Sequence, residues 1–111
     1  MFLIVAKYLI PKGYRGMTVF PFVVLKYDFD KANQVFVNHE RIHLKQQIEL
    51  LIIPFFVWYF LEYLFRLAQY KNKDLAYRNI SFEREAYAKE TDLNYLKKRS
   101  FFQFMDYIKL K

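Results

Sequence analysis

The first quarter of the chain carries hydrophobic patterns that are typical of short strands. Residues 2–10 are mostly apolar and predict a strand or an extended arm. Residues 17–26 are rich in β-branched and aromatic side chains and predict a second strand. Pro21 lies within this second stretch and lacks a backbone N–H, so we expect an edge strand or a bulge there. Gly13 and Gly16 lie between the two stretches, in a turn-rich segment.

The remainder of the chain has the longer apolar spacing of helices. A first helix is predicted from about Ala32 or Val35 to Ile53, and Pro54 should end or kink it because a proline inside a helix costs ~3 kcal/mol. A second helix is expected over 55–69, which is apolar nearly all round, and a polar connection follows it at 70–78. A third helix is expected over 82–98, with Ser81 as N-cap, and a last amphipathic piece over 101–110. The expected fold class is α+β, mainly helical, with a small N-terminal strand element before the first long helix.

Length and composition indicate one compact unit. At 111 residues, the chain is expected to form a single domain over 1–111. A hydrophobic fraction of 55% is enough for a sizeable core, and the low glycine and proline content argues against disorder. The chain has no cysteine, so any metal site must use histidine and carboxylate ligands. The lack of cysteine also fits a reducing compartment, and we expect a cytoplasmic protein.

The charge of the chain bears on its partners. A net charge of +7 suits an anionic membrane surface or a nucleic acid, although a solvated basic face is the simpler interpretation. There is no aromatic RNA-binding motif, so we do not expect a nucleic-acid partner. The longest apolar run, from Leu50 to Leu61, is shorter than the ~20 residues of a membrane span. We expect a buried helix there, with contact between residues 50–66 and a membrane surface as the alternative.

An H-E-x-x-H pattern lies in the first predicted helix, formed by His39, Glu40 and His43. Residues at i and i+4 share one helix face, so the two imidazoles can bind one Zn²⁺ at about 2.0–2.1 Å. Glu40 then lies beside the metal, where it can take a proton from a bound water as general base. The alternative without a metal site is a surface helix with two solvated histidines.

A catalytic zinc site needs a third protein ligand and one open position. The chain has only these two histidines and no cysteine, so the third ligand must be a carboxylate. A helix continued from His43 would carry Glu62 roughly 28 Å away, and Glu62 can instead pair with Arg66 at i+4. Glu83 begins a new helix after the polar connection, where the chain can have reversed and the helix dipole favours an acid. Geometry therefore favours Glu83, with Glu62 and Glu85 left open.

The H-E-x-x-H pattern followed by Glu83-x-Glu85-Ala86 resembles the gluzincin metallopeptidases. The short chain is similar in length to the minigluzincins, which are single-domain gluzincins. The resemblance implies a zincin-like domain, Glu83 as third zinc ligand, and a peptide or protein substrate that pairs with the strand before the motif helix. The chain departs from these families at Tyr87, where they often have Asp or Asn to support a zinc histidine. Asn38, Gln46 or a backbone carbonyl could take that role.

Hydrolysis of a peptide bond also needs a hydrogen-bond donor for the oxyanion. A third histidine is not available, so Tyr77, Arg78 and Tyr87 are the candidates. The function we predict from the sequence is a zinc metallopeptidase with Zn²⁺ as its cofactor. The alternatives are a non-catalytic zinc-binding domain and a membrane-associated basic interaction domain.

Overall fold

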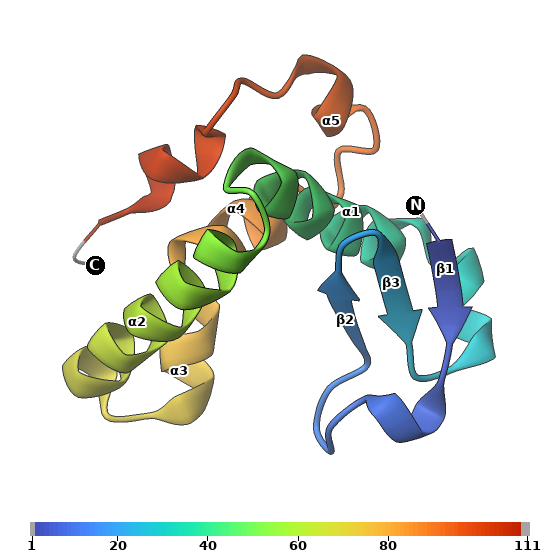
Figure 1. Cartoon of the computed structure of the whole chain (residues 1–111), viewed down its shortest axis with the longest axis horizontal. Helices are drawn as coiled ribbons and strands as arrows, with labels where there is room; N and C mark the ends of the chain where they lie inside the picture. The colour runs from blue at the N-terminus through green and yellow to red at the C-terminus, as the bar shows by residue number, and fades with distance from the viewer. Residues whose placement is uncertain (1, 110–111) are drawn as a thin grey trace.

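The computed structural model describes residues 2–109 and has the mainly helical α+β architecture that the sequence predicts (Figure 1). The strands are β1 (Phe2–Val5), β2 (Gly16–Val19) and β3 (Phe22–Leu25), and they form one sheet in the order β1-β3-β2. Strand β1 is parallel to β3 and β2 is antiparallel to it. The helices are α1 (Gln34–Glu49), α2 (Ile53–Tyr70), α3 (Lys73–Arg78), α4 (Ser81–Lys89) and α5 (Tyr95–Lys98), with 3₁₀ turns at Lys7–Leu9, Asp28–Ala32 and Gln103–Tyr107.

The single strand predicted over residues 17–26 is wrong, because the chain folds there into a hairpin of β2 and β3. Phe20 and Pro21 connect the two strands, a place where the missing N–H of proline leaves no ladder hydrogen bond unmade. Strand β3 becomes the central strand, and its three buried side chains are Val23, Val24 and Leu25. The sheet therefore has β2 at one edge, which matters for the site.

Helix boundaries also differ from the prediction, because turn chemistry rather than apolar spacing decides them. Helix α1 starts with Asn33 as N-cap, whose side chain accepts from the Phe36 N–H at 3.1 Å, and it ends at Glu49. Pro54 does not end this helix. It lies in the first turn of α2, where a missing N–H has no cost. A bend of 113° separates α1 from α2, and the turn is made by Leu51 and Ile52, both with positive φ.

The predicted helix over 82–98 is two helices, α4 and α5, and the polar connection at 70–78 contains α3. Ser81 is the first residue of α4 rather than its N-cap, which is Ile80, and the Ser81 hydroxyl donates to Glu62 Oε1 at 2.7 Å. The piece expected over 101–110 is a 3₁₀ turn at Gln103–Tyr107, and Leu110 lies outside the described residues.

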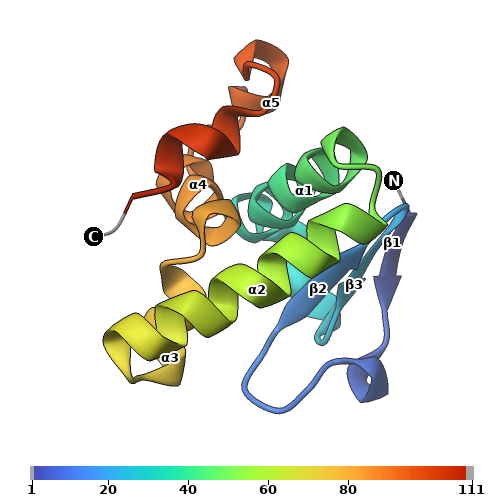
Figure 2. The same ribbon diagram turned by 60° about the vertical axis from the view of Figure 1, so that its left-hand side comes forward.

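Helix α2 is not the buried helix that its composition predicts. Within it, only Phe55, Glu62 and Arg66 are buried. Most of its large apolar side chains are exposed to solvent, and Figure 2 shows the helix running along the outside of the molecule. Among residues 2–109, no single helix is both long and apolar enough to cross a bilayer, whereas the bent pair of α1 and α2 meets that length and composition together.

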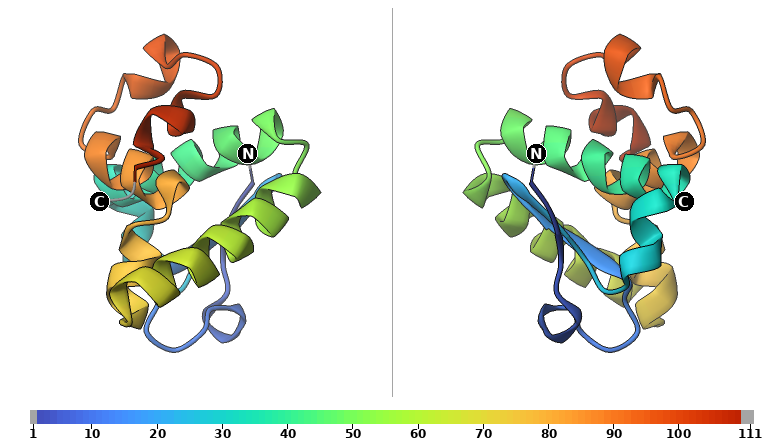
Figure 3. Two further views of the ribbon diagram at one scale, coloured as in Figure 1. Left: turned by 90° about the vertical axis from the view of Figure 1, so that its left-hand side faces the viewer. Right: turned by 90° about the vertical axis from the view of Figure 1, so that its right-hand side faces the viewer.

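Helix α1 is central and positions the site. It packs against β2 on one side and against α4 on the other (Figures 1 and 3). A fully buried Phe82 joins α4 to α2 and to the C-terminal 3₁₀ turn through contacts with Phe55 and Phe104. Ile42 and Ala86 form a second apolar cluster between α1 and α4. These contacts hold α4 against α1, so that side chains from both helices can meet.

Candidate metal centre

Three side chains from two helices converge on one point. His39 and His43 extend from α1, and Glu83 extends from the first turn of α4. Glu83 Oε1 lies 3.2 Å from His39 Nε2 and 3.0 Å from His43 Nε2, and the two nitrogens are 3.2 Å apart. All three residues are buried. Ligands about 2.0–2.1 Å from one zinc ion at the corners of a tetrahedron are about 3.3 Å apart, so the three atoms are spaced as such ligands would be.

Glu62 does not join this group, and its actual role explains how Glu83 reaches it. The carboxylate of Glu62 accepts from the Ser81 N–H at 2.6 Å and from the Ser81 hydroxyl at 2.7 Å. It also lies 3.5 Å from Arg66 Nη2, as the i+4 spacing predicts. Glu62 therefore ties the start of α4 to α2 and so fixes the turn of helix that carries Glu83.

Each histidine has an oxygen beside its other ring nitrogen. Gln46 Oε1 lies 2.9 Å from His43 Nδ1, and the Gln46 amide donates to the Phe82 carbonyl at 3.1 Å. Glu90 Oε1 lies 3.7 Å from His39 Nδ1. Zinc-binding histidines usually donate their other N–H to a carboxylate or carbonyl, which orients the ring. The arrangement leaves both Nε2 atoms directed at Glu83.

Glu90 was not found by sequence reasoning, although its spacing carries a signal. It follows Glu83 by two helical turns, so the two acids share one side of α4. Asn38, a residue considered for the supporting role, donates instead to the backbone carbonyls of Glu90 at 2.9 Å and Asp92 at 3.0 Å. Asn38 thereby secures the end of α4 next to His39. Tyr87 contacts the His39 ring, with centroids 4.6 Å apart.

Glu85 lies on the other side of Gln46 and does not contact the histidines. It accepts from Gln46 at 2.9 Å and from the Tyr95 hydroxyl at 2.7 Å, and it is paired with Arg99. Arg99 also reaches Glu49 at 2.6 Å. Glu85 thus belongs to a buried network that supports Gln46, and through it the orientation of His43.

Tyr59 of α2 is a further contact that the sequence did not suggest. Its hydroxyl donates to Glu83 Oε2 at 2.6 Å, which leaves Oε1 toward the histidines. Burial and the neighbouring Glu83 raise the pKa of Tyr59, so the hydroxyl keeps its proton and remains a donor. Burial alone would raise the pKa of Glu83, but His43 and His39 hold it below its usual range. The carboxylate is therefore ionised, as a metal ligand must be.

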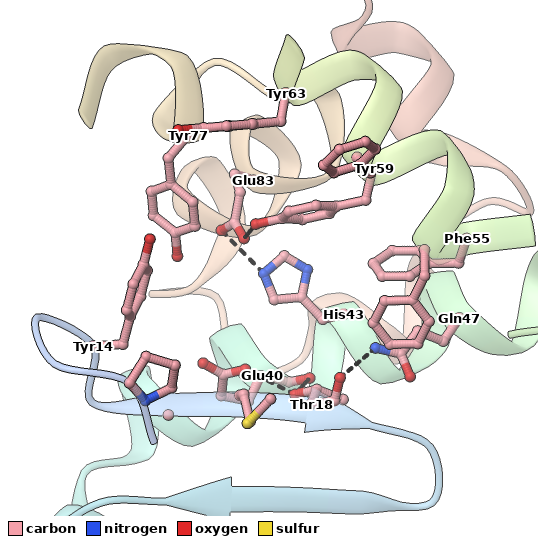
Figure 4. Close-up of a pocket in the computed structure, with 15 residues that line it drawn as sticks. Tyr14, Thr18, Glu40, His43, Gln47, Phe55, Tyr59, Tyr63, Tyr77 and Glu83 are labelled. Atoms are coloured by element: carbon pink, nitrogen blue, oxygen red, sulfur yellow. Dashed lines mark hydrogen bonds and ion pairs between the residues drawn. The ribbon is translucent and has the colours of Figure 1, made fainter. Parts of the chain in front are cut away.

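The remaining residue of the motif, Glu40, points to the side of β2. Thr18 Oγ1 donates to Glu40 Oε2 at 2.7 Å. Figure 4 shows Thr18 and Glu40 on one side of a cleft and Tyr59, Tyr77 and Glu83 on the other, with His43 between them. Strand β2 lies close to α1 because residue 16 is glycine, where an added Cβ would be 2.9 Å from the Phe36 ring.

The cleft has a volume of about 570 Å³ and an aromatic wall supplied by α2. A second hollow of about 780 Å³ lies on the His39 side and contains basic groups. Tyr14, Gly16, Glu40 and Tyr77 line both, so the two hollows adjoin at the motif. The cleft is lined by Pro11, Met17, Thr18, His43, Gln47, Phe55, Phe56, Tyr59, Phe60, Tyr63 and Glu83 in addition to the shared residues.

The three candidate oxyanion donors do not all line the same hollow. Tyr77 faces the cleft together with His43 and Glu83. Tyr87 and Arg78 line the second hollow, and the Arg78 guanidinium lies 4.8 Å from the centre of the Tyr87 ring. Burial and Glu83 raise the pKa of Tyr77, which keeps its hydroxyl protonated. Of the three, Tyr77 alone lines the hollow that contains both His43 and Glu83.

Comparison with known protein families, with curated proteins and with solved structures finds no match to this chain. The resemblance to the gluzincins therefore stays a prediction from the two motifs. The structure itself supports a coarser statement: His39, His43 and Glu83 form a buried group that could hold a metal ion.

Proposed function

We propose that the protein is a zinc-dependent metallopeptidase. The observation that carries the proposal is the meeting of His39, His43 and Glu83 beside a cleft into which Glu40 also faces. Two imidazole nitrogens and one carboxylate oxygen are a donor set that catalytic zinc uses. When bound, zinc lowers the pKa of a coordinated water to ~7 and polarises a carbonyl.

Glu40 is the proposed general base. Its Oε2 is held by the Thr18 hydroxyl at 2.7 Å, and the other carboxylate oxygen is assigned to proton transfer. Glu40 takes the proton of the attacking water and passes it to the amine that leaves when the peptide bond breaks. Tyr77, whose hydroxyl stays protonated, is the proposed donor to the oxyanion.

The outer edge of β2 is the proposed docking edge for the peptide. Arg15 O accepts from Lys26 N at 2.8 Å, so the backbone groups of Arg15 point toward β3. Successive residues of a strand direct their N–H and C=O groups to opposite sides, so those of Gly16 and Thr18 point away from β3. The Gln47 side chain occupies part of this edge, because it donates to Thr18 O at 2.6 Å and accepts from Phe20 N at 2.7 Å. Gly16 and the Thr18 N–H remain as the stretch beside the cleft where an extended substrate can add as a strand.

The test compares untagged wild type with Glu40→Gln. Metal content is measured first, and cleavage is then followed on a library of internally quenched peptides. We expect both proteins to retain zinc and only the wild type to cleave. Asp28→Asn is the matched control, since the Asp28 side chain is 85% exposed and lines neither hollow at the motif. A wild type that binds zinc and cleaves nothing would support the non-catalytic zinc-binding alternative instead.

A further inference from the structure

Helix α2 and the turn before it have an inverted distribution of side chains. The two charged side chains of the helix, Glu62 and Arg66, are directed inward, with exposures of 9% and 1%. Every exposed side chain from residue 51 to residue 68 is apolar. These are Leu51, Ile53, Pro54, Phe56, Val57, Trp58, Phe60, Leu61, Leu64, Phe65 and Ala68. We call this set the α2 face.

The inward charges are satisfied within the protein. Glu62 accepts two hydrogen bonds from Ser81 and pairs with Arg66. Water-soluble proteins expose their charges and bury large apolar groups. Helices in contact with lipid do the reverse, since their ionisable residues face the protein interior and pair with one another. The distribution on α2 is therefore the one that lipid favours.

The width of the α2 face distinguishes lipid from a single protein partner. With about 100° per residue, the exposed positions from Ile53 to Ala68 cover an arc of about 200° of the helix. A stripe that packs against one neighbouring surface is typically about 100° wide or somewhat more. A bilayer surrounds a partly immersed helix and can cover the whole arc. We propose that α2 inserts its exposed face into the surface of a phospholipid bilayer.

The charges around the α2 face fit anionic headgroups. Lys71 and Lys73 follow the end of α2, and Lys109 lines a groove together with Phe65 and Arg66. The whole chain carries a net charge of +7. Cations at the rim of an apolar helix face can contact lipid phosphates while the apolar groups enter the acyl region. Trp58, the single tryptophan of the chain, lies in the face as interfacial tryptophans do.

The bilayer would then lie beside the cleft. Phe56 and Phe60 belong to the α2 face and also line the cleft with His43 and Glu83. Figure 3 shows α2 as the outermost element on its side of the molecule. If the proposed peptidase function holds, on which this last step rests, the substrates are polypeptide segments at or just above a membrane surface.

Flotation of the full untagged chain with vesicles tests the insertion. The vesicles contain phosphatidylcholine and phosphatidylglycerol, and a second set carries brominated acyl chains that quench tryptophan at short range. The chain is expected to float with the vesicles, and Trp58 fluorescence is expected to fall on the brominated set. In the variant with Val57→Glu and Leu64→Glu, two charges lie in the α2 face away from the cleft, and most of the protein should stay in solution.

The matched control carries Tyr8→Glu and Leu93→Glu, which place two charges outside α2. Tyr8 is 96% exposed and Leu93 is 50% exposed. It should float as the wild type does, and an unchanged circular-dichroism spectrum in both variants reports an intact fold. The proposal is overturned by a wild type that does not float, or by α2-face variants that float equally well. If the wild type is a dimer without detergent and the Val57→Glu and Leu64→Glu variant is a monomer, the α2 face binds a second copy of the chain instead of lipid. Glu40→Gln should float normally, so loss of cleavage and loss of lipid binding are separable.

Discussion

The Glu90 carboxylate lies 3.7 Å from Nδ1 of His39 and occupies the supporting position that the sequence led us to seek at residue 87. Glu90 comes from the end of α4, and Asn38 holds the backbone there through its hydrogen bonds. Tyr87 packs against the ring of the same histidine. An acid at the C-cap of α4, about one turn after residue 87, thus lies beside His39, where it can orient the imidazole ring.

Replacement of Glu90 by glutamine should weaken zinc binding by about 10–100-fold, the usual effect of losing an oriented partner of a metal ligand. The neutral amide no longer favours the N–H on Nδ1 of His39, while the size of the side chain is kept. Competition with a chromophoric chelator measures the affinity. Asp28→Asn should bind as wild type does, and an unchanged affinity in Glu90→Gln would remove Glu90 from the site.

Glu62→Ala should act on stability rather than on zinc coordination. The substitution leaves Arg66 buried next to an unfilled space and removes both acceptors of Ser81. Loss of one partner of a buried ion pair costs about 3–5 kcal/mol in the free energy of unfolding. Urea denaturation should show this loss, whereas zinc should still bind under native conditions. Complete loss of zinc without loss of stability would make Glu62 a ligand.

Zinc binding should release one proton at neutral pH. Burial alone would lower the pKa of His43, but Glu83 at 3.0 Å raises it to about 9 when no cation is bound. His43 is then protonated at pH 7, and zinc must displace that proton. The affinity for zinc should rise tenfold per pH unit up to about pH 9 and level off above it. Titration calorimetry in buffers of different ionisation enthalpy counts the protons, and zero released protons would contradict the assignment.

The raised pKa of His43 also makes the stability of the metal-free protein depend on pH. The folded pKa of His43 lies above the ordinary 6.5, so its contribution to stability is complete below pH 6.5 and is lost as pH rises through about 9. The free energy of unfolding of chelator-treated protein should therefore fall over this window. Constant stability from pH 6.5 to 9 would show that the Glu83–His43 pair is not formed without metal.

Thr18→Val should lower kcat/KM while zinc content stays the same. The valine keeps the shape of the strand residue but removes the hydroxyl that fixes Glu40 Oε2. A misplaced general base costs on the order of 10–100-fold in rate. Thr91→Val, at an exposed threonine, is the matched control for the peptidase assay. Equal activity in both variants would mean that Thr18 does not position Glu40.

The main features of the fold and of the site could be predicted because they depend on local pattern. Helical spacing placed His39 and His43 on one face, and the need for chain reversal favoured Glu83 over Glu62. The hairpin at Pro21 was missed because a proline in a strand-like run is compatible with a bulge as well as with a turn. Tyr59 was missed because its place at the site depends on how α2 packs in the folded chain. Glu90 was missed because its place depends on where α4 ends.

The exposure of α2 could not be predicted from its composition. An apolar helix is usually buried, and periodicity alone does not say whether the apolar side faces protein or solvent. The structure shows that Glu62 and Arg66 lie on the buried side of α2. Val57, Leu61 and Leu64 lie on its exposed side. The outward apolar side is the observation on which the proposed membrane contact rests.

Zinc-edge X-ray absorption of the untagged chain tests the central claim most directly. We expect metal analysis to give one zinc per chain, and the absorption spectrum to show two imidazole nitrogens and carboxylate oxygen in its coordination sphere. Glu83→Ala should lose the metal, whereas Glu85→Gln should keep it, because Glu85 contacts Gln46 and Arg99 rather than the histidines. A chain without stoichiometric zinc, or one that keeps the same spectrum in Glu83→Ala, would contradict the assignment of His39, His43 and Glu83 as zinc ligands.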